Sequence, residues 1–216
     1  GPFENITSTK EILDHPWPRP EWFDLEPLLK ESEDFSDKVI IGGFWSALFS
    51  HCFRMYGYQN FLVDMLMRPE FIKTLVDRTT EFYLEMNERM FSTMRGKMDI
   101  FFLGSDFGSQ QGLLISEESW LDLHYENYKK LINHAHSHGL KVMFHSCGSI
   151  TPLIPHFIKL GVEFGMKFIV IALTFGVIRQ FTGDGTSNGR AFFLKSGIII
   201  VGNIGIQGQP FGCLER

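Results

Sequence analysis

The stretch LKVMFHSCGSITPLIPHFIKLG, residues 140–161, predicts a strand, a short loop and a helix in succession. Side chains of a strand alternate between its two faces, so His145 and Cys147 are expected to point the same way at the strand end. Enzymes of the α/β class place their chemistry at the carboxyl ends of such strands. Because imidazole nitrogen and thiolate sulfur both suit zinc, His145 and Cys147 are candidate metal ligands.

Strands and helices also alternate in the chain before this stretch, and a further strand begins at residue 161, which predicts an α/β fold with a parallel sheet. No Gly-x-Gly-x-x-Gly follows a predicted strand, so a (β/α)8 barrel is favoured over a doubly wound nucleotide-binding sheet. The predicted strands lie at residues 38–43, 98–104 and 140–143 and from residue 161. The predicted helices lie at residues 24–30, 45–56 and 59–67, from Pro69 onward, at 116–139 and at 151–160.

Net charge, cysteine spacing and the length of the apolar runs indicate which partners and which cellular compartment to expect. The chain has 216 residues and a formal net charge of -5, which argues against a nucleic-acid surface. Its three cysteines are widely spaced and do not resemble a disulfide framework, so a reducing, cytoplasmic setting is expected. The longest apolar run, residues 168–175, is too short to span a bilayer, and no membrane association is expected.

Three regions differ in character. Residues 1–38 form a Pro-rich, extended N-terminal segment, because each proline at residues 15–20 keeps its predecessor out of the α region. Residues 39–164 hold the strand and helix repeats. Residues 165–216 are Gly-rich and apolar, lose the helical periodicity, and could hold later barrel strands such as the run at 198–202.

Several motifs together resemble the uroporphyrinogen decarboxylase superfamily, which also contains cobalamin-dependent methyltransferases. These motifs are Gly42-Gly43-Phe44-Trp45-Ser46, the loop Asp106-Phe107-Gly108-Ser109-Gln110-Gln111-Gly112, the helix before Gly139, and Phe144-His145-Ser146-Cys147-Gly148-Ser149-Ile150. The resemblance implies a (β/α)8 barrel with its site at the carboxyl ends of the strands. Family members are considerably longer, so the chain resembles an incomplete barrel.

The resemblance implies zinc-dependent methyl transfer to or from a corrinoid protein as the leading hypothesis. The similar methyltransferases hold zinc with a His-x-Cys pair and a later third ligand, and His145 and Cys147 match the pair. Cys213 is a candidate for the third ligand, with Asp106 and His51 as alternatives. Such a zinc would activate a thiol substrate or polarise a methyl ether or amine. The partner would be a corrinoid protein or a small methyl donor or acceptor, and a homo-oligomer is a further expectation.

Two alternatives remain open. A uroporphyrinogen decarboxylase-like lyase would need no cofactor, but the arginine-rich N-terminal signature is missing and the expected tyrosine is absent near Ser50. A truncated, inactive barrel could persist in a structural or assembly role. Such a barrel would expose strand edges and apolar surface and would therefore need a partner or self-association.

The remaining site candidates have structural explanations as well. Asp106 and His145 are predicted catalytic residues, although an aspartate after a strand can simply cap its own turn. Trp45, Gln110 and Gln111 are predicted to bind substrate, although the glutamines could bond loop backbone instead. Cys52 is expected in the core. The three histidines at 134, 136 and 138 are explained by the favourable C-terminal end of a helix dipole rather than by a metal.

Overall fold

The computed structural model describes residues 1–166, 191–194 and 198–201. Six strands form one sheet in the order β4-β3-β2-β1-β6-β5. The strands are β1 (Val39–Gly42), β2 (Ile100–Gly104), β3 (Lys141–His145), β4 (Phe164–Met166), β5 (Ala191–Leu194) and β6 (Ile198–Val201). The predicted strands in the first part of the chain and the predicted strand near residue 200 are therefore confirmed.

Strands β1 to β4 are parallel and lie in sequence order, as the alternating pattern predicts. Strand β6 is parallel to β1 on its other side, and β5 is antiparallel to β6. Within the described residues the sheet ends at β4 and β5 and does not close on itself. The fold is therefore of the α/β, TIM-barrel type with an incomplete barrel.

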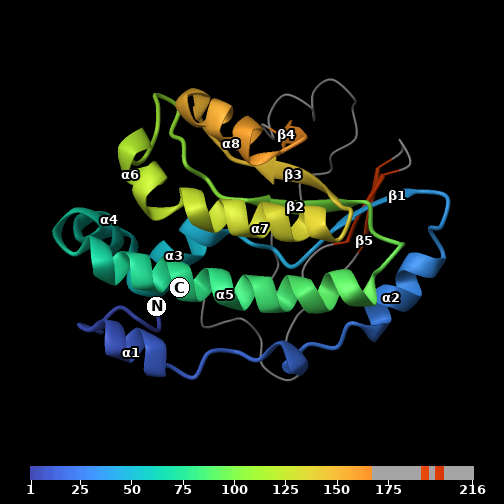
Figure 1. The fold of residues 1–216 in the computed structure, drawn as a ribbon, viewed down its shortest axis with the longest axis horizontal. Coiled ribbons are helices and arrows are strands. Elements are labelled where there is room, and N and C mark those ends of the chain that lie inside the picture. Colours follow the sequence, from blue (N-terminus) through green and yellow to red (C-terminus); the bar gives the residue numbers. More distant parts are fainter. Residues whose placement is uncertain (167–190, 195–197, 202–216) are drawn as a thin grey trace.

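The helices confirm a barrel-type arrangement, because α5, α7 and α8 lie side by side across one face of the parallel strands (Figure 1). A doubly wound sheet would place helices on both faces, whereas a barrel keeps them outside. The helices are α1 (Thr9–Asp14), α2 (Glu26–Glu33), α3 (Leu48–Tyr56), α4 (Tyr58–Met67), α5 (Pro69–Thr93), α6 (Glu117–Leu123), α7 (Tyr125–Ser137) and α8 (Ile154–Leu160), with 3-10 turns at Pro20–Trp22 and Thr151–Leu153.

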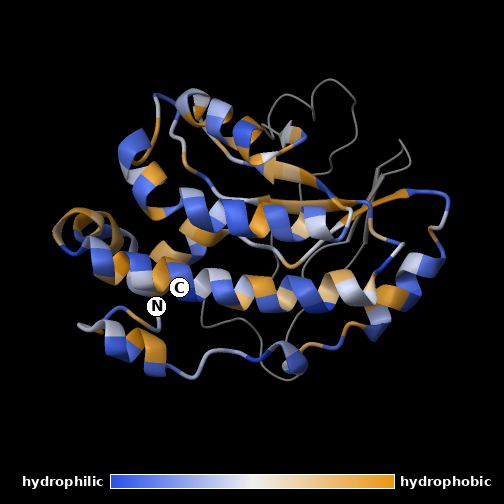
Figure 2. Ribbon diagram, in the orientation of Figure 1, coloured by the Kyte–Doolittle hydropathy of each residue, from blue (hydrophilic) through white to orange (hydrophobic). Residues whose placement is uncertain are grey.

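The core lies between the sheet and these helices. Phe101 of β2 contacts Phe91 of α5 with ring centroids 5.2 Å apart, and Phe144 of β3 stacks on Phe157 of α8 at 3.9 Å. Apolar residues predominate along the strands (Figure 2), and the helices contribute buried apolar residues to the same core. Burying a side chain such as Phe101 contributes about 1.5–3 kcal/mol, which fixes the helices on this face of the sheet.

The helix predicted over residues 116–139 is instead two helices, α6 and α7. His124 interrupts it with φ -121° and ψ -28°, and its ring is fully buried against Phe49 and Phe107. Tertiary packing at His124 thus overrides the local helical pattern. The predicted cap at Ser116 and the left-handed Gly139 are confirmed, with φ +77° at Gly139.

Helix α1 lies within the Pro-rich N-terminal segment and was not predicted. Its signal is a capping box: the Ser8 side chain accepts a hydrogen bond from the Glu11 backbone, and the Glu11 carboxylate accepts one from the Ser8 backbone. Ile12 then buries completely in the core. Among the residues that the structure describes, no helix combines the length and apolar character needed to cross a membrane.

Candidate functional site

Three predicted residues converge at the carboxyl ends of β2 and β3. Gly104 at the end of β2 pairs with His145 at the end of β3, so the two following loops start side by side. His145 Nε2 lies 3.4 Å from Cys147 Sγ and 3.5 Å from Asp106 Oδ1. One ligand atom from each of the three residues lies within 4.8 Å of the other two. The arrangement presents nitrogen, sulfur and oxygen donors to one point.

Hydrogen bonds from backbone N–H groups to side-chain oxygens join the two loops that carry this triad. The Cys147 N–H donates to Asp106 Oδ1 at 2.8 Å, and the Phe107 N–H donates to Ser146 Oγ at 3.1 Å. Ser146 is buried and was missed by the sequence analysis, because a serine between two candidate ligands has no distinguishing pattern. The cross-loop bonds hold Asp106 against Cys147.

Close backbone contact between the loops requires glycine. A Cβ on Gly148 would lie 2.2 Å from the carbonyl oxygen of Gly108, and Gly148 also has φ +73°. A Cβ on Gly108 would in turn lie 2.6 Å from the Ser149 nitrogen. Neither loop can therefore carry a side chain at the crossing point without moving the other.

The Gly148→Ala variant is expected to lose at least about 2 kcal/mol of unfolding free energy, because the left-handed conformation and the overpacked contact are both unfavourable. Gly112→Ala is the matched control in the same loop system, since a Cβ there meets nothing within 4 Å. Chemical denaturation of both variants measures the difference. Equal stability of the two variants would show that the loops do not cross as described.

The Cys147 thiol is not ionised in the metal-free protein near neutral pH. Burial, a hydrogen bond with Asp106 and the negative charge of Asp106 together raise the pKa of Cys147 to about 11. The Asp106 side chain is about half exposed (52%), whereas His145 is buried (8%). A cation at this point would offset the charge of Asp106 and favour the thiolate.

Trp45 lies on the same side of the sheet as His145. Phe102 pairs with Met143, and His145 follows Met143 by two residues, so the side chains of all three share one face. The Trp45 ring packs on Phe102 with centroids 5.1 Å apart. The Trp45 ring therefore packs on the face of the sheet that carries His145.

Gln110 and Gln111 lie exposed at the tip of the loop after β2. Ser109 closes this tip, because its Oγ accepts hydrogen bonds from the backbone N–H groups of Gln111 and Gly112, both at 3.2 Å. Both glutamine side chains are accessible from solvent, and their role in substrate binding stays a prediction.

The other candidate ligands are not part of the triad. His51 contacts the Tyr83 hydroxyl, and burial together with the charge of Arg54 lowers the pKa of His51 to about 4. Cys52 is buried beside Thr79, as expected for a core cysteine, and burial raises its pKa to about 12. Cys213 lies outside the described residues. Among the described residues, Asp106 is therefore the third donor beside His145 and Cys147.

Parallel strands, helices on one face and donor side chains at the strand ends define a protein of the (β/α)-barrel class. The family model described as uroporphyrinogen decarboxylase (URO-D) matches residues 26–172, which is more than half of the chain. The chain therefore belongs to the uroporphyrinogen decarboxylase family.

A solved structure described as a methyltransferase from Methanosarcina mazei is similar to this fold, with a TM-score of 0.53 and 19% sequence identity. The similarity covers 64% of this chain and 39% of the methyltransferase, so the chain spans well under half of that protein's length. At this identity the likeness concerns the fold. No curated protein matches the chain.

Proposed function

We propose that this chain is a zinc-dependent methyltransferase that moves a methyl group to or from a corrinoid protein. The observation that carries the proposal is the convergence of Asp106 Oδ1, His145 Nε2 and Cys147 Sγ at one point. Membership of the family and the likeness to a methyltransferase fold support it.

The donor spacing fits a tetrahedral zinc ion. Typical zinc–ligand bonds of about 2.0–2.3 Å place neighbouring donors of a tetrahedron roughly 3.4–3.6 Å apart. The distances from His145 Nε2 to Cys147 Sγ and to Asp106 Oδ1 are 3.4 and 3.5 Å. Three protein ligands would leave the fourth position for a substrate, as catalytic zinc sites do.

The chemistry that zinc supplies when bound is Lewis acidity, which lowers the pKa of a thiol substrate or polarises a methyl ether or amine. Asp106, His145 and Cys147 would hold the ion, with Cys147 giving up its proton. Asp106 accepts a hydrogen bond from the Cys147 N–H and so fixes the position of Cys147 relative to the end of β2. Trp45 offers an apolar wall on the same face of the sheet, suited to a methyl-bearing substrate.

Zinc affinity at the triad is expected to rise with pH. The metal binds the thiolate, and the pKa of Cys147 is about 11 in the metal-free protein, so binding releases one proton at every pH below that value. The apparent affinity should therefore increase by about tenfold per pH unit between about pH 7 and 8.5. Competition with a chelator of known pH dependence measures it. In the Cys147→Ala variant this dependence should disappear, and an equal affinity across the range in the wild-type protein would contradict the assignment.

Methyl transfer from methylcobalamin to a thiol tests the proposed function directly. Loss of the methyl–cobalt absorption should require zinc and the wild-type triad, and Cys147→Ala should reduce the rate to that of the uncatalysed reaction. His136→Ala is a suitable control, because His136 lies on α7 and contacts Glu163 rather than the triad. Equal rates for the wild-type protein and Cys147→Ala would refute the proposal.

A uroporphyrinogen decarboxylase-like lyase is the second candidate, favoured by the half-exposed Asp106 carboxylate beside His145. Such a carboxylate could hold pyrrole N–H groups without a metal. This activity predicts porphyrinogen turnover in the presence of a chelator, and its loss in Asp106→Asn. Absence of turnover by the wild-type protein on that substrate would exclude it.

A further inference from the structure

A second cluster of metal-ligating side chains lies away from the triad. Glu88 lies in the last turns of α5, His134 lies in the last turn of α7, and His138 is the residue that follows α7. The chain passes from the end of α7 into the start of β3, whereas the triad follows the end of that strand. The cluster and the triad therefore lie at opposite ends of the strands.

The three side chains approach one another at the spacing of metal ligands. Glu88 Oε2 lies 3.1 Å from His138 Nε2 and 3.5 Å from His134 Nε2. One ligand atom from each residue lies within 4.8 Å of the other two. For zinc–nitrogen and zinc–oxygen bonds of about 2.0–2.2 Å, neighbouring donors of a tetrahedron are about 3.4 Å apart. The two observed distances bracket that value.

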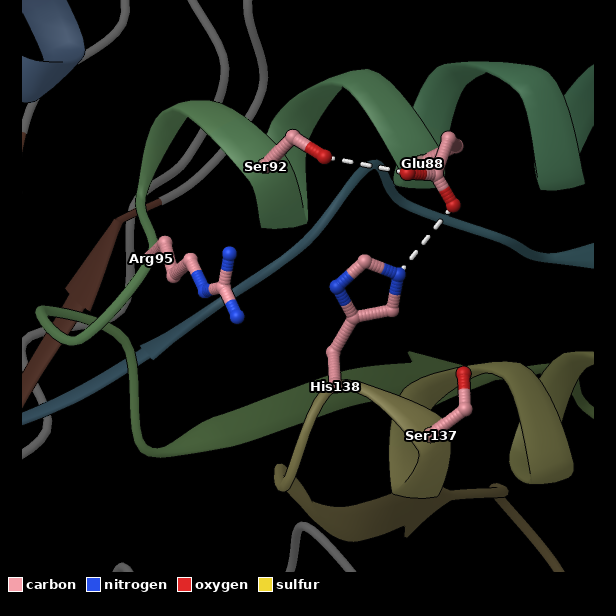
Figure 3. A pocket seen from close by; sticks show the side chains of 5 residues that line it. All are labelled: Glu88, Ser92, Arg95, Ser137 and His138. Carbon is pink, nitrogen blue, oxygen red and sulfur yellow. Dashed lines mark hydrogen bonds and ion pairs between the residues drawn. The ribbon is translucent and has the colours of Figure 1, made fainter.

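Neighbouring side chains orient the three donors. Ser92, one turn after Glu88, donates a hydrogen bond to Glu88 Oε1 at 3.0 Å and leaves Oε2 turned toward His138 (Figure 3). The Phe91 ring stacks on His134 at 5.4 Å and meets His138 edge-on at 5.3 Å. Such supporting contacts around the ligands are typical of metal sites. The rings of His134 and His138 lie side by side at the end of α7, with centroids 5.0 Å apart.

The ion pairs of Glu88 with the two histidines leave one ligand atom of the cluster without a hydrogen bond. The Nε2 atom of His134 is buried and makes no hydrogen bond within the described part of the chain. Histidine binds a metal through a ring nitrogen of the neutral imidazole, so a buried ring nitrogen that lacks a hydrogen bond is a suitable ligand atom.

We propose that Glu88, His134 and His138 bind a divalent transition-metal ion of the zinc type. A pocket of about 310 Å³ adjoins the cluster and is lined by Glu88, Ser92, Arg95, Ser137 and His138 (Figure 3). A ligand from this pocket would complete the coordination at the remaining position. Water or a small anion suits that position, because Arg95 and two hydroxyl groups form the rest of the wall. The ion would join α5 to α7 on the outer surface of the sheet and stabilise their packing.

Zinc titration of the Cys147→Ala variant tests this site, because the triad is then disabled. About one equivalent of Zn²⁺ should still bind. Adding Glu88→Gln or His134→Ala should weaken this binding by about a hundredfold or more. Mutating a residue that only supports a ligand already lowers metal affinity by about 10–100-fold. Adding His136→Ala is the matched control and should leave the affinity unchanged, because His136 contacts Glu163 instead. The Glu88 side chain is 54% exposed, so Glu88→Gln is expected to fold normally.

Cobalt provides a second, spectroscopic readout in the same variants. Co²⁺ in a histidine and carboxylate site gives visible d–d absorption without thiolate charge transfer, whereas Co²⁺ at the triad shows both. The proposal is overturned if Cys147→Ala binds no metal, or if Glu88→Gln and His134→Ala leave its metal affinity unchanged. Neither result bears on the triad, so failure here leaves the proposed function intact.

Discussion

The Cys147→Ala variant is expected to lose the thiolate-to-cobalt charge-transfer absorption that Co²⁺ should produce in the wild-type protein. Cys147 Sγ is the sulfur donor that lies 3.4 Å from His145 Nε2, and no other described residue offers a thiol at the strand ends. Removing one of three protein ligands should weaken metal binding at the triad by about a hundredfold or more, because mutating a residue that only supports a ligand already lowers metal affinity by about 10–100-fold. Absorption spectroscopy during a Co²⁺ titration measures both effects.

Two other cysteine variants serve as controls. Cys52→Ala should keep the charge-transfer absorption, because Cys52 is buried beside Thr79 and away from the triad. Cys213→Ser tests whether Cys213 contributes a further ligand, as predicted from the sequence. A reduced charge-transfer band in this variant would support that role. A full charge-transfer band in Cys147→Ala would refute the assignment of Cys147 as a ligand.

The Phe107→Ala variant is expected to lose about 3–5 kcal/mol of unfolding free energy, the usual cost of removing a buried phenylalanine ring. Phe107 is fully buried and stacks on Phe49 with ring centroids 4.8 Å apart. It also meets Trp120 and His124 edge-on, so one ring joins the loop after β2 to α3 and α6. A substantial cavity would remain, because these large neighbours cannot easily close around it.

The loss of Phe107 should also affect the triad, since Phe107 follows Asp106 directly and its N–H donates to Ser146. Chemical denaturation gives the stability change, and zinc affinity reports on Asp106. Leu114→Ala is the control in the same loop: the Leu114 N–H donates to the Phe107 carbonyl, but its side chain is partly exposed, so a loss of about 1 kcal/mol or less is expected. Equal losses in the two variants would show that Phe107 does not anchor the loop.

Local sequence determined the order of the elements and the pair His145 and Cys147. Apolar runs of strand length predicted β1, β2 and β3, and Ser116 and Gly139 marked the ends of the helical region between β2 and β3. These signals involve neighbours within a few residues, where backbone geometry alone fixes which side chains share a face. The Ser8 capping box was equally local, and the helix it begins could have been predicted from its Ser-x-x-Glu pattern.

Only the tertiary structure decided which distant residues meet. Asp106 and Cys147 are 41 residues apart, and Glu88 and His138 are 50 apart, yet each pair forms a hydrogen bond. The break at His124 likewise follows from packing against Phe49 and Phe107 rather than from local propensity. Periodicity within one element carries no information on such contacts, because they depend on the strand register and on how α5 packs against α7. The sequence by itself therefore determined two candidate ligands and their strand, and the fold showed which further candidate, Asp106, lies beside them.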